Sequence, residues 1–209
     1  AISFTTQPVA PANAGGLMTT QPVVRLEDAQ GNVINDRSST VVVSSVLASN
    51  TATTSGSVGG TTSLSTSTGV ATFTNLTFGG VVGTNYKVKA LSGAVSAFSD
   101  NVTNSQAGTP AKLRVFTEPA LTATQLVGDA FNTQPVVRVL DSGDNITTST
   151  ATVTATPSSP PSGGTLGGTT SVAAVSGTAT FAGLTFAGLV STNYRLTFSS
   201  PGLTSTESD

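Results

Sequence analysis

Oxygen-bearing side chains are concentrated in one short stretch of the second half of the sequence. Asp141, Asp144 and Asn145 place two carboxylates and one amide within a single five-residue segment. Calcium is held by about six to eight oxygen ligands, so this stretch could begin a calcium site. Asp and Asn are equally typical of a plain β-turn, in which their side chains bond to the local backbone. The turn is the better-supported interpretation, so we expect no cofactor, and calcium is the one alternative that the pattern leaves open.

The remaining reactive side chains do not form a catalytic set. Glu27 and Asp28 are adjacent, so on a strand their carboxylates point to opposite faces and cannot act as an acid–base pair. Lys112 is a candidate for a covalent Lys–Asn cross-link, but it alternates with Leu113 toward solvent, which favours a solvated lysine. The chain has no Cys, His or Trp, which excludes zinc fingers, thiol nucleophiles and His-based catalysis. We expect a protein that is not an enzyme.

Composition favours strands and excludes several partners. Only 9% of the residues are charged, against about 25% in an average soluble domain, and β-branched Thr and Val are abundant. The eight cations are scattered through a chain of net charge −2, which argues against a nucleic-acid surface. No apolar run approaches the roughly 18 residues of a membrane span, so we expect no membrane insertion of this segment.

Four blocks of sequence recur in the same order, and this repeat organises the chain. The block Thr20–Leu26 returns as Thr133–Val139, and Ala71–Phe73 returns as Ala179–Phe181. The other two recurrences are Phe4–Pro8 with Phe116–Pro119 and Gly59–Ser63 with Gly167–Ser171. The numbering shift between the copies changes between the block Thr20–Leu26 and the block Gly59–Ser63, which indicates that the loop between them differs in length. A unit of this size is that of one immunoglobulin-type sandwich, so each copy should fold alone.

The boundary between the copies is expected in a small, polar stretch. Residues Asn104–Pro110 are rich in turn formers and contain no large apolar side chain. We therefore predict two domains, residues 1–106 and residues 107–209.

Alternation of apolar and polar residues predicts the strands. In Tyr86–Ala90 the residues Tyr86, Val88 and Ala90 face one way and both lysines the other; Tyr194–Phe198 is the copy. Seven strands are expected in the first copy, with counterparts in the second, near residues 1–7, 20–27, 39–47, 61–66, 69–75, 84–91 and 95–103. The predicted fold class is all-β, with two tandem immunoglobulin-like β-sandwiches of about seven strands each.

Four aromatic residues at fixed repeat positions are candidates for structural roles. Phe73 and Phe181 alternate with polar neighbours and are interpreted as core rather than as a binding platform. Tyr86 and Tyr194 are the only two tyrosines, one in each copy, at the start of the sixth strand. A tyrosine corner would place its phenol there, bonded back to upstream backbone.

The motifs resemble those of a known group of domains. The segments Gln21–Asn32 and Gly69–Phe78 are similar to the bacterial Ig-like repeats of cell-surface proteins and invasin- or intimin-type adhesins. The resemblance covers nearly the whole chain and rests on folding motifs rather than on a binding site. It implies a non-catalytic structural or spacer module of an adhesin stalk, located outside the cell, whose partners are adjacent Ig-like repeats.

Two alternatives remain open. Ser99-Asp100 aligns with Ser208-Asp209, where the second copy stops, so its last strand is expected to be short. A neighbouring chain could supply the rest, which would make the protein a subunit of an extracellular filament assembled from identical subunits by head-to-tail strand complementation. The second alternative is a carbohydrate-binding module. The sequence identifies no host or matrix ligand.

Overall fold

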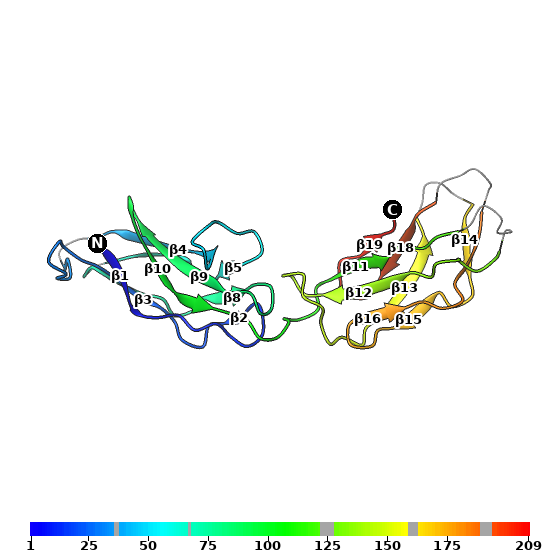
Figure 1. Cartoon of the computed structure of the whole chain (residues 1–209), viewed down its shortest axis with the longest axis horizontal. Helices are drawn as coiled ribbons and strands as arrows, with labels where there is room; N and C mark the ends of the chain where they lie inside the picture. Colours follow the sequence, from blue (N-terminus) through cyan, green and yellow to red (C-terminus); the bar gives the residue numbers. More distant parts are fainter. Residues whose placement is uncertain (36–37, 67, 122–127, 159–162, 189–193) are drawn as a thin grey trace. The chain divides into compact units, whose positions relative to one another are not determined.

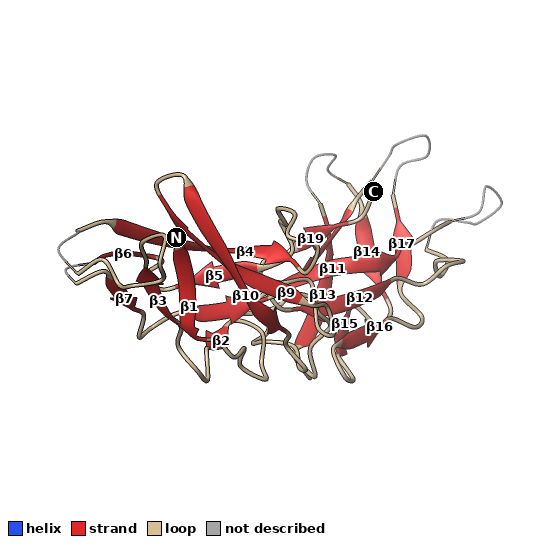
Figure 2. Ribbon diagram, turned by 60° about the vertical axis from the view of Figure 1, so that its left-hand side comes forward, coloured by secondary structure: helices blue, strands red, loops and turns tan. Residues whose placement is uncertain are grey.

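The computed structural model describes residues 1–35, 38–66, 68–121, 128–158, 163–188 and 194–209. Figure 2 shows these residues as strands and loops without helix, which confirms the all-β prediction. Contacts divide the chain into two compact units, Ala1–Gly108 and Thr109–Asp209, two residues beyond the boundary expected from the sequence. Arg37, one of the eight cations counted in the sequence, lies outside the described residues.

The first unit is an antiparallel β-sandwich (Figure 1). One sheet has the order β1 (Ile2–Thr6), β3 (Val23–Leu26), β7 (Val70–Thr72). The opposing sheet has the order β10 (Val95–Val102), β9 (Tyr86–Ser92), β4 (Thr40–Leu47), β6 (Ser63–Ser65). These are the seven expected strands. A small third sheet, unexpected from the sequence, has the order β2 (Gly16–Leu17), β8 (Thr77–Gly79), β5 (Ser57–Gly59).

The second unit repeats this arrangement. One sheet has the order β11 (Lys112–Thr117), β12 (Val136–Leu140), β16 (Thr178–Thr180). The opposing sheet has the order β15 (Ser171–Ala173), β13 (Thr152–Pro157), β18 (Leu196–Ser199), β19 (Thr206–Glu207), and β14 (Thr165–Gly167) pairs with β17 (Thr185–Ala187). The strand expected over residues 194–198 begins at Leu196. In the first unit the matching strand, β9, already begins at Tyr86, the counterpart of Tyr194. As expected, the last strand is short.

Each unit has a hydrophobic core made only of its own residues. In β3 and β12 the inward positions Val24 and Val137 are fully buried, whereas Arg25 and Arg138 alternate with them toward the outer face. The expected core residues Phe73 and Phe181 are also buried, one in each core. Burying one such aromatic side chain contributes about 3 kcal/mol, so each core can stabilise its own unit.

The first strand of each unit corrects one alignment made from the sequence. Phe4 of β1 pairs with Val24, but it is Val115, not Phe116, that pairs with the equivalent Val137. Because side chains on a strand alternate between faces, this one-residue difference sends Phe4 inward against the core and Phe116 outward. Phe116 is accordingly 58% exposed, and its match with Phe4 is one of sequence and not of position.

A glycine in each unit is required by the approach of two chain segments. Gly69 and Gly177 both have a φ of +74°, a conformation that side chains with a Cβ rarely adopt. A Cβ on Gly69 would lie 2.4 Å from the carbonyl oxygen of Ile34, and one on Gly177 would lie 2.1 Å from that of Thr147. Through its carbonyl, each glycine accepts a hydrogen bond from the central strand, at Leu26 and Val139. This close approach explains why a glycine stands two residues before Ala71 and before Ala179.

Candidate functional site

The candidate calcium ligands Asp141 and Asn145 lie in the turn that follows β12, where both are buried. Oδ1 of Asp141 accepts hydrogen bonds from the backbone N–H groups of Gly143 (2.8 Å) and Asn145 (2.9 Å). Its Oδ2 accepts a third bond from the side-chain amide of Asn145 at 2.9 Å. The carboxylate thus holds the turn closed from inside, which is the use of Asp and Asn that a β-turn makes.

The first unit contains the same turn after β3. Asp28 accepts from the backbone N–H groups of Gln30 and Asn32, each at 2.9 Å, and from the side-chain amide of Asn32 at 3.1 Å. These bonds, led by the backbone N–H of Asn32, lower the pKa of the Asp28 carboxyl below its ordinary value. The residue with positive φ in this turn is Gly31, and its counterpart in the second unit is Asp144.

The third candidate ligand, Asp144, contacts cations on the neighbouring strand. Its Oδ1 lies 3.0 Å from Nζ of Lys112 and 3.4 Å from Nη1 of Arg114, both on β11. Lys112, the candidate for a covalent cross-link, therefore pairs with a partly exposed carboxylate on the outer face. The structure brings Asp141 and Asn145 together and places Asp144 with the cations. Within the described residues, no three His, Cys, Asp or Glu side chains gather as a metal-binding group.

The candidate structural residue Tyr86 is fully buried at the start of β9. Its phenol oxygen accepts the backbone N–H of Val81 at 3.2 Å and lies 3.1 Å from the hydroxyl of Ser55. The ring is flanked by two glycines, because a Cβ on Gly56 or Gly80 would lie 2.7 or 2.6 Å from its carbon atoms. The bond to Val81, five residues upstream, is of the kind that a tyrosine corner makes.

Tyr194 lies in the matching place in the second unit, where it is half-buried. Its ring packs against Phe186, with 4.9 Å between the ring centroids. A Cβ on Gly164 or Gly188 would approach the tyrosine ring to 2.9 or 2.7 Å. The sequence analysis missed these glycines, although both recur at the same offset as the tyrosine.

The Gln of the recurring Gln-Pro motif also serves the fold. Gln21 donates from Nε2 to the carbonyl oxygens of Met18 (3.3 Å) and Leu76 (3.0 Å), and its Oε1 accepts the N–H of Leu76 at 2.9 Å. Gln134 repeats this with Phe131 and Leu184. Each amide joins the segment before a central strand to the segment before β8 or β17. The Gln of the Gln-Pro motif, one of the residues on which the resemblance rests, thus stabilises the fold of each unit.

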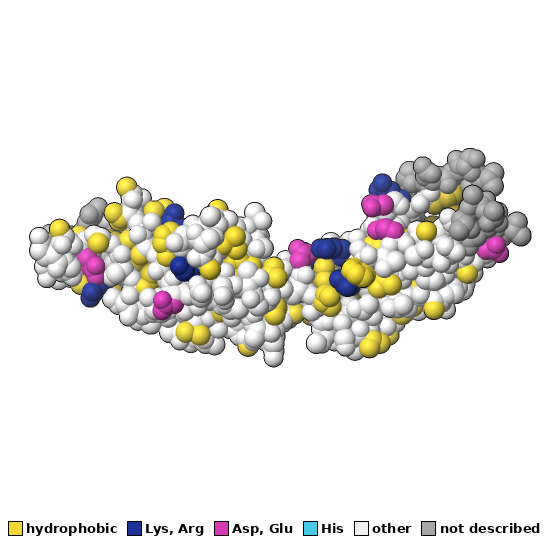
Figure 3. All heavy atoms as spheres, viewed as in Figure 1, with side chains coloured by type: hydrophobic (Ala, Val, Ile, Leu, Met, Phe, Trp, Pro, Cys, Tyr) yellow, Lys and Arg dark blue, Asp and Glu magenta, His cyan; other side chains and the backbone are white. Residues whose placement is uncertain are grey.

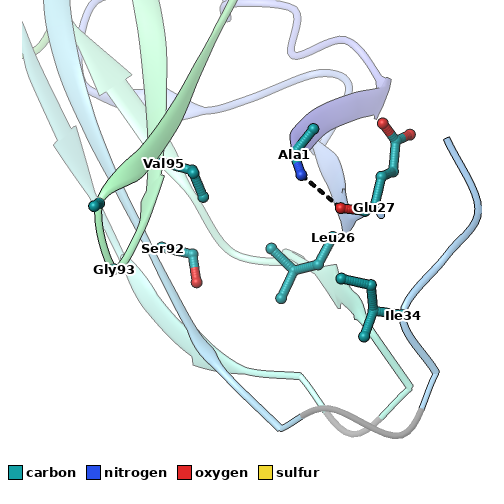
Figure 4. Close-up of a pocket in the computed structure, with 8 residues that line it drawn as sticks. Ala1, Leu26, Glu27, Ile34, Ser92, Gly93 and Val95 are labelled. Atoms are coloured by element: carbon teal, nitrogen blue, oxygen red, sulfur yellow. Dashed lines mark hydrogen bonds between the residues drawn. The ribbon is translucent and has the colours of Figure 1, made fainter. Parts of the chain in front are cut away.

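A shallow hollow of about 270 Å³ lies at one end of the first unit. Figure 4 shows the terminal amine of Ala1 donating to the carbonyl oxygen of Glu27 at its rim. The lining is mainly apolar and consists of Ala1, Leu26, Glu27, Ile34, Ser92, Gly93, Ala94 and Val95. The Glu27 carboxylate is bonded to the Ser3 hydroxyl and to Arg25, which lower its pKa. Among the described residues that line the hollow, Glu27 has no second carboxylate beside it that could complete an acid–base pair.

Among the residues that the structure describes, no helical segment has the length and apolar character that crossing a membrane requires.

No protein-family model and no curated protein sequence matches the chain. Similar solved structures include a β-glucuronidase of Parabacteroides merdae (14% identity, TM-score 0.33) and a β-glycosidase of Bacteroides vulgatus (10% identity, TM-score 0.38). Each match covers 99% of this chain but only 24% of the glycosidase, so the chain spans about a quarter of those proteins. Domains 5–6 of the S-layer protein SbsC match at 17% identity and a TM-score of 0.33, covering 100% of this chain and 95% of that one. Likenesses this distant do not assign a family.

Proposed function

We propose that the chain is a non-catalytic spacer segment of an extracellular surface protein, in which two Ig-like modules are linked in series. The observation that carries the proposal is the pair of separate cores, each built from one repeat and repeated position by position. A module with a complete core of its own can be placed in a row with others, as a stalk requires. The resemblance to bacterial Ig-like surface repeats supports the same assignment, with neighbouring repeats as partners.

The roles of the recurring polar residues support a structural function. Asp28 and Asp141 close turns, Gln21 and Gln134 join loops, and Tyr86 bonds to backbone within its own unit. Polar groups that act in catalysis are directed toward a space where a substrate can sit. The groups that recur here are directed into the fold, as expected for residues selected to maintain a sandwich.

Small-angle scattering on the purified chain tests the spacer. A spacer holds its modules apart, so the distribution of interatomic distances should have one maximum for distances within a unit and a second for distances between units. A single maximum, from two units packed side by side, would contradict the proposal. Sedimentation of the same sample at rising concentration addresses the filament alternative, because head-to-tail assembly would raise the mass with concentration.

A further inference from the structure

The outer face of β11 and β12 combines cations with an exposed aromatic ring. Lys112, Arg114 and Phe116 alternate along β11 on this face, and Arg138 lies on β12 directly opposite Arg114. Figure 3 shows dark blue cationic side chains close together among hydrophobic ones on one part of the second unit, with another cationic side chain of this unit lying apart from them. The guanidinium carbon of Arg138 lies 3.3 Å from the centroid of the Phe116 ring, and Phe116 as a residue is 58% exposed. These four residues are called the β11–β12 face below.

The first unit provides a matched comparison, because its core is the same and its corresponding face is different. At the positions of Lys112, Arg114 and Phe116, the strand register places Ala1, Ser3 and Thr5. The arginine of the central strand is kept as Arg25, but it is paired there with Glu27 and with the Ser3 hydroxyl. In the second unit the position of Glu27 is taken by Leu140, which is buried. Four changes on one face thus remove an acid and add two cations and a ring.

This arrangement is unfavourable without an anion. Like charges directly opposite each other on neighbouring strands destabilise a sheet, and Arg114 faces Arg138 in this way. Asp144 contacts this face through Lys112 and Arg114. Nε of Arg138 is buried and finds no hydrogen-bond partner within the described part of the chain. Three cations on one face, two of which share one carboxylate, stand out in a unit that carries more acidic than basic residues.

We propose that the β11–β12 face binds a linear acidic polysaccharide. Carboxylates of the polymer bond to Arg114 and Lys112, and a sugar ring lies on the open side of Phe116. Alternate residues on a strand are spaced by about 6.7 Å, so Lys112 and Arg114 lie in a row along β11 that suits an extended ligand, and Phe116 follows them at the register shift between Val115 and Thr117. Arginine is suited to carboxylate because its planar fork can make two parallel hydrogen bonds. This binding is additional to the spacer role and does not depend on it.

The small size of the face and the charge of the unit favour a carboxylate-bearing polysaccharide over nucleic acid. A nucleic acid presents a charge at every phosphate, and proteins bind it with extended basic surfaces. The β11–β12 face is small, and the unit around it is acidic overall. A polysaccharide with carboxylates separated by neutral hydroxyls matches a face on which a ring alternates with cations.

The test is the binding of the full chain to immobilised polygalacturonate at low salt, with neutral dextran and single-stranded DNA in parallel. The expected result is binding to polygalacturonate that weakens as salt rises, and no binding to dextran. The double variant R114S/F116T gives this face the residues Ser3 and Thr5 of the first unit. It should bind polygalacturonate at least about tenfold more weakly, a difference of about 1.4 kcal/mol.

The matched control is the double variant K87S/K89S, which removes two cations from the outer side of β9 in the first unit. It should keep the affinity of the unaltered chain, because it leaves the β11–β12 face intact. The single variant K112A removes the other proposed carboxylate-binding side chain and leaves the core untouched, so it should also bind polygalacturonate more weakly. Equal losses in R114S/F116T and K87S/K89S, no binding by the unaltered chain, or tighter binding to DNA than to polygalacturonate would each overturn the proposal.

Discussion

The tyrosine of each repeat depends on residues that have no side chain. Tyr86 fits against Gly56 and Gly80, and Tyr194 fits against Gly164 and Gly188, so the ring occupies the volume that two Cβ atoms would fill. Sequence alone predicted the tyrosines as structural because each is the only one in its copy. The glycines could be recognised only by comparing the two copies at the same offset.

Replacing Tyr86 by Ala should cost the first unit about 3–5 kcal/mol, as for other buried aromatic side chains. Tyr86→Phe should cost only about 1 kcal/mol, because the ring stays and the hydrogen bonds to Val81 and Ser55 are lost. Chemical denaturation followed by circular dichroism measures both. The transition of the second unit should not move, and an unchanged first transition in Tyr86→Ala would show that the ring does not stabilise the core.

Two glycines in the first unit allow the cost of an unfavourable backbone conformation to be distinguished from the cost of a steric clash. Gly31 and Gly69 both have positive φ, but a Cβ on Gly31 meets no atom within 4 Å, whereas one on Gly69 meets the Ile34 carbonyl oxygen. Gly31→Ala should therefore cost only the conformational strain, about 1 kcal/mol. Gly69→Ala should cost about 3 kcal/mol or more, because backbone must move as well. Thermal melting of the two variants measures the difference, and equal losses would place Gly69 in open space.

At the scale of elements, the turn that follows the central strand has the same hydrogen bonds in both copies. Asp28 and Asp141 make the same three hydrogen bonds, although the residue with positive φ changes from Gly31 to Asp144. Asp tolerates this conformation better than most residues with a Cβ. In the second unit this exchange adds to the turn a second carboxylate, which reaches β11.

The turn makes the stability of the first unit sensitive to acid. The pKa of Asp28 is lower in the folded chain than in the unfolded chain, so its contribution is complete above the ordinary value of 3.8. It is lost as the pH falls below that value through the folded pKa, because the unfolded chain then binds the proton more readily. Melting temperatures measured across this range should fall less steeply for Asp28→Asn than for the unaltered chain. Parallel curves would mean that Asp28 titrates alike in both states.

Strand positions were predictable to different degrees, for physical reasons. Long strands with alternating burial, such as β4 and β9, leave a period-two pattern that the sequence reveals. The strands β2, β5 and β8 have two or three residues, too few for a period. The register of β11 was wrong at Phe116, because identical residues suggested a match that only backbone pairing could correct. The β11–β12 face could not be found without that correction.

At the scale of the whole molecule, the separation of the cores predicts two independent unfolding events. The fragments Ala1–Gly108 and Thr109–Asp209 should each fold alone and unfold cooperatively, since single domains of this size usually do. Scanning calorimetry of the full chain should show two transitions, and the free energy of unfolding of each unit should agree with that of its isolated fragment within about 1 kcal/mol. A fragment that remains unfolded, or a full chain markedly more stable than both, would show that the units stabilise each other.

The near identity of β3 and β12 has a consequence for the recovery of the native state after denaturation. Val23–Leu26 and the first four residues of β12, Val136–Val139, differ only at their last position, and each is the centre of its sheet. During refolding, either segment can enter the wrong sheet with its apolar side chains correctly oriented. Misassembly and strand exchange between neighbouring units are characteristic failures of repeat proteins. We expect the residue after each segment to oppose such an exchange, because a swapped β3 would bring the carboxylate of Glu27 to the place of buried Leu140.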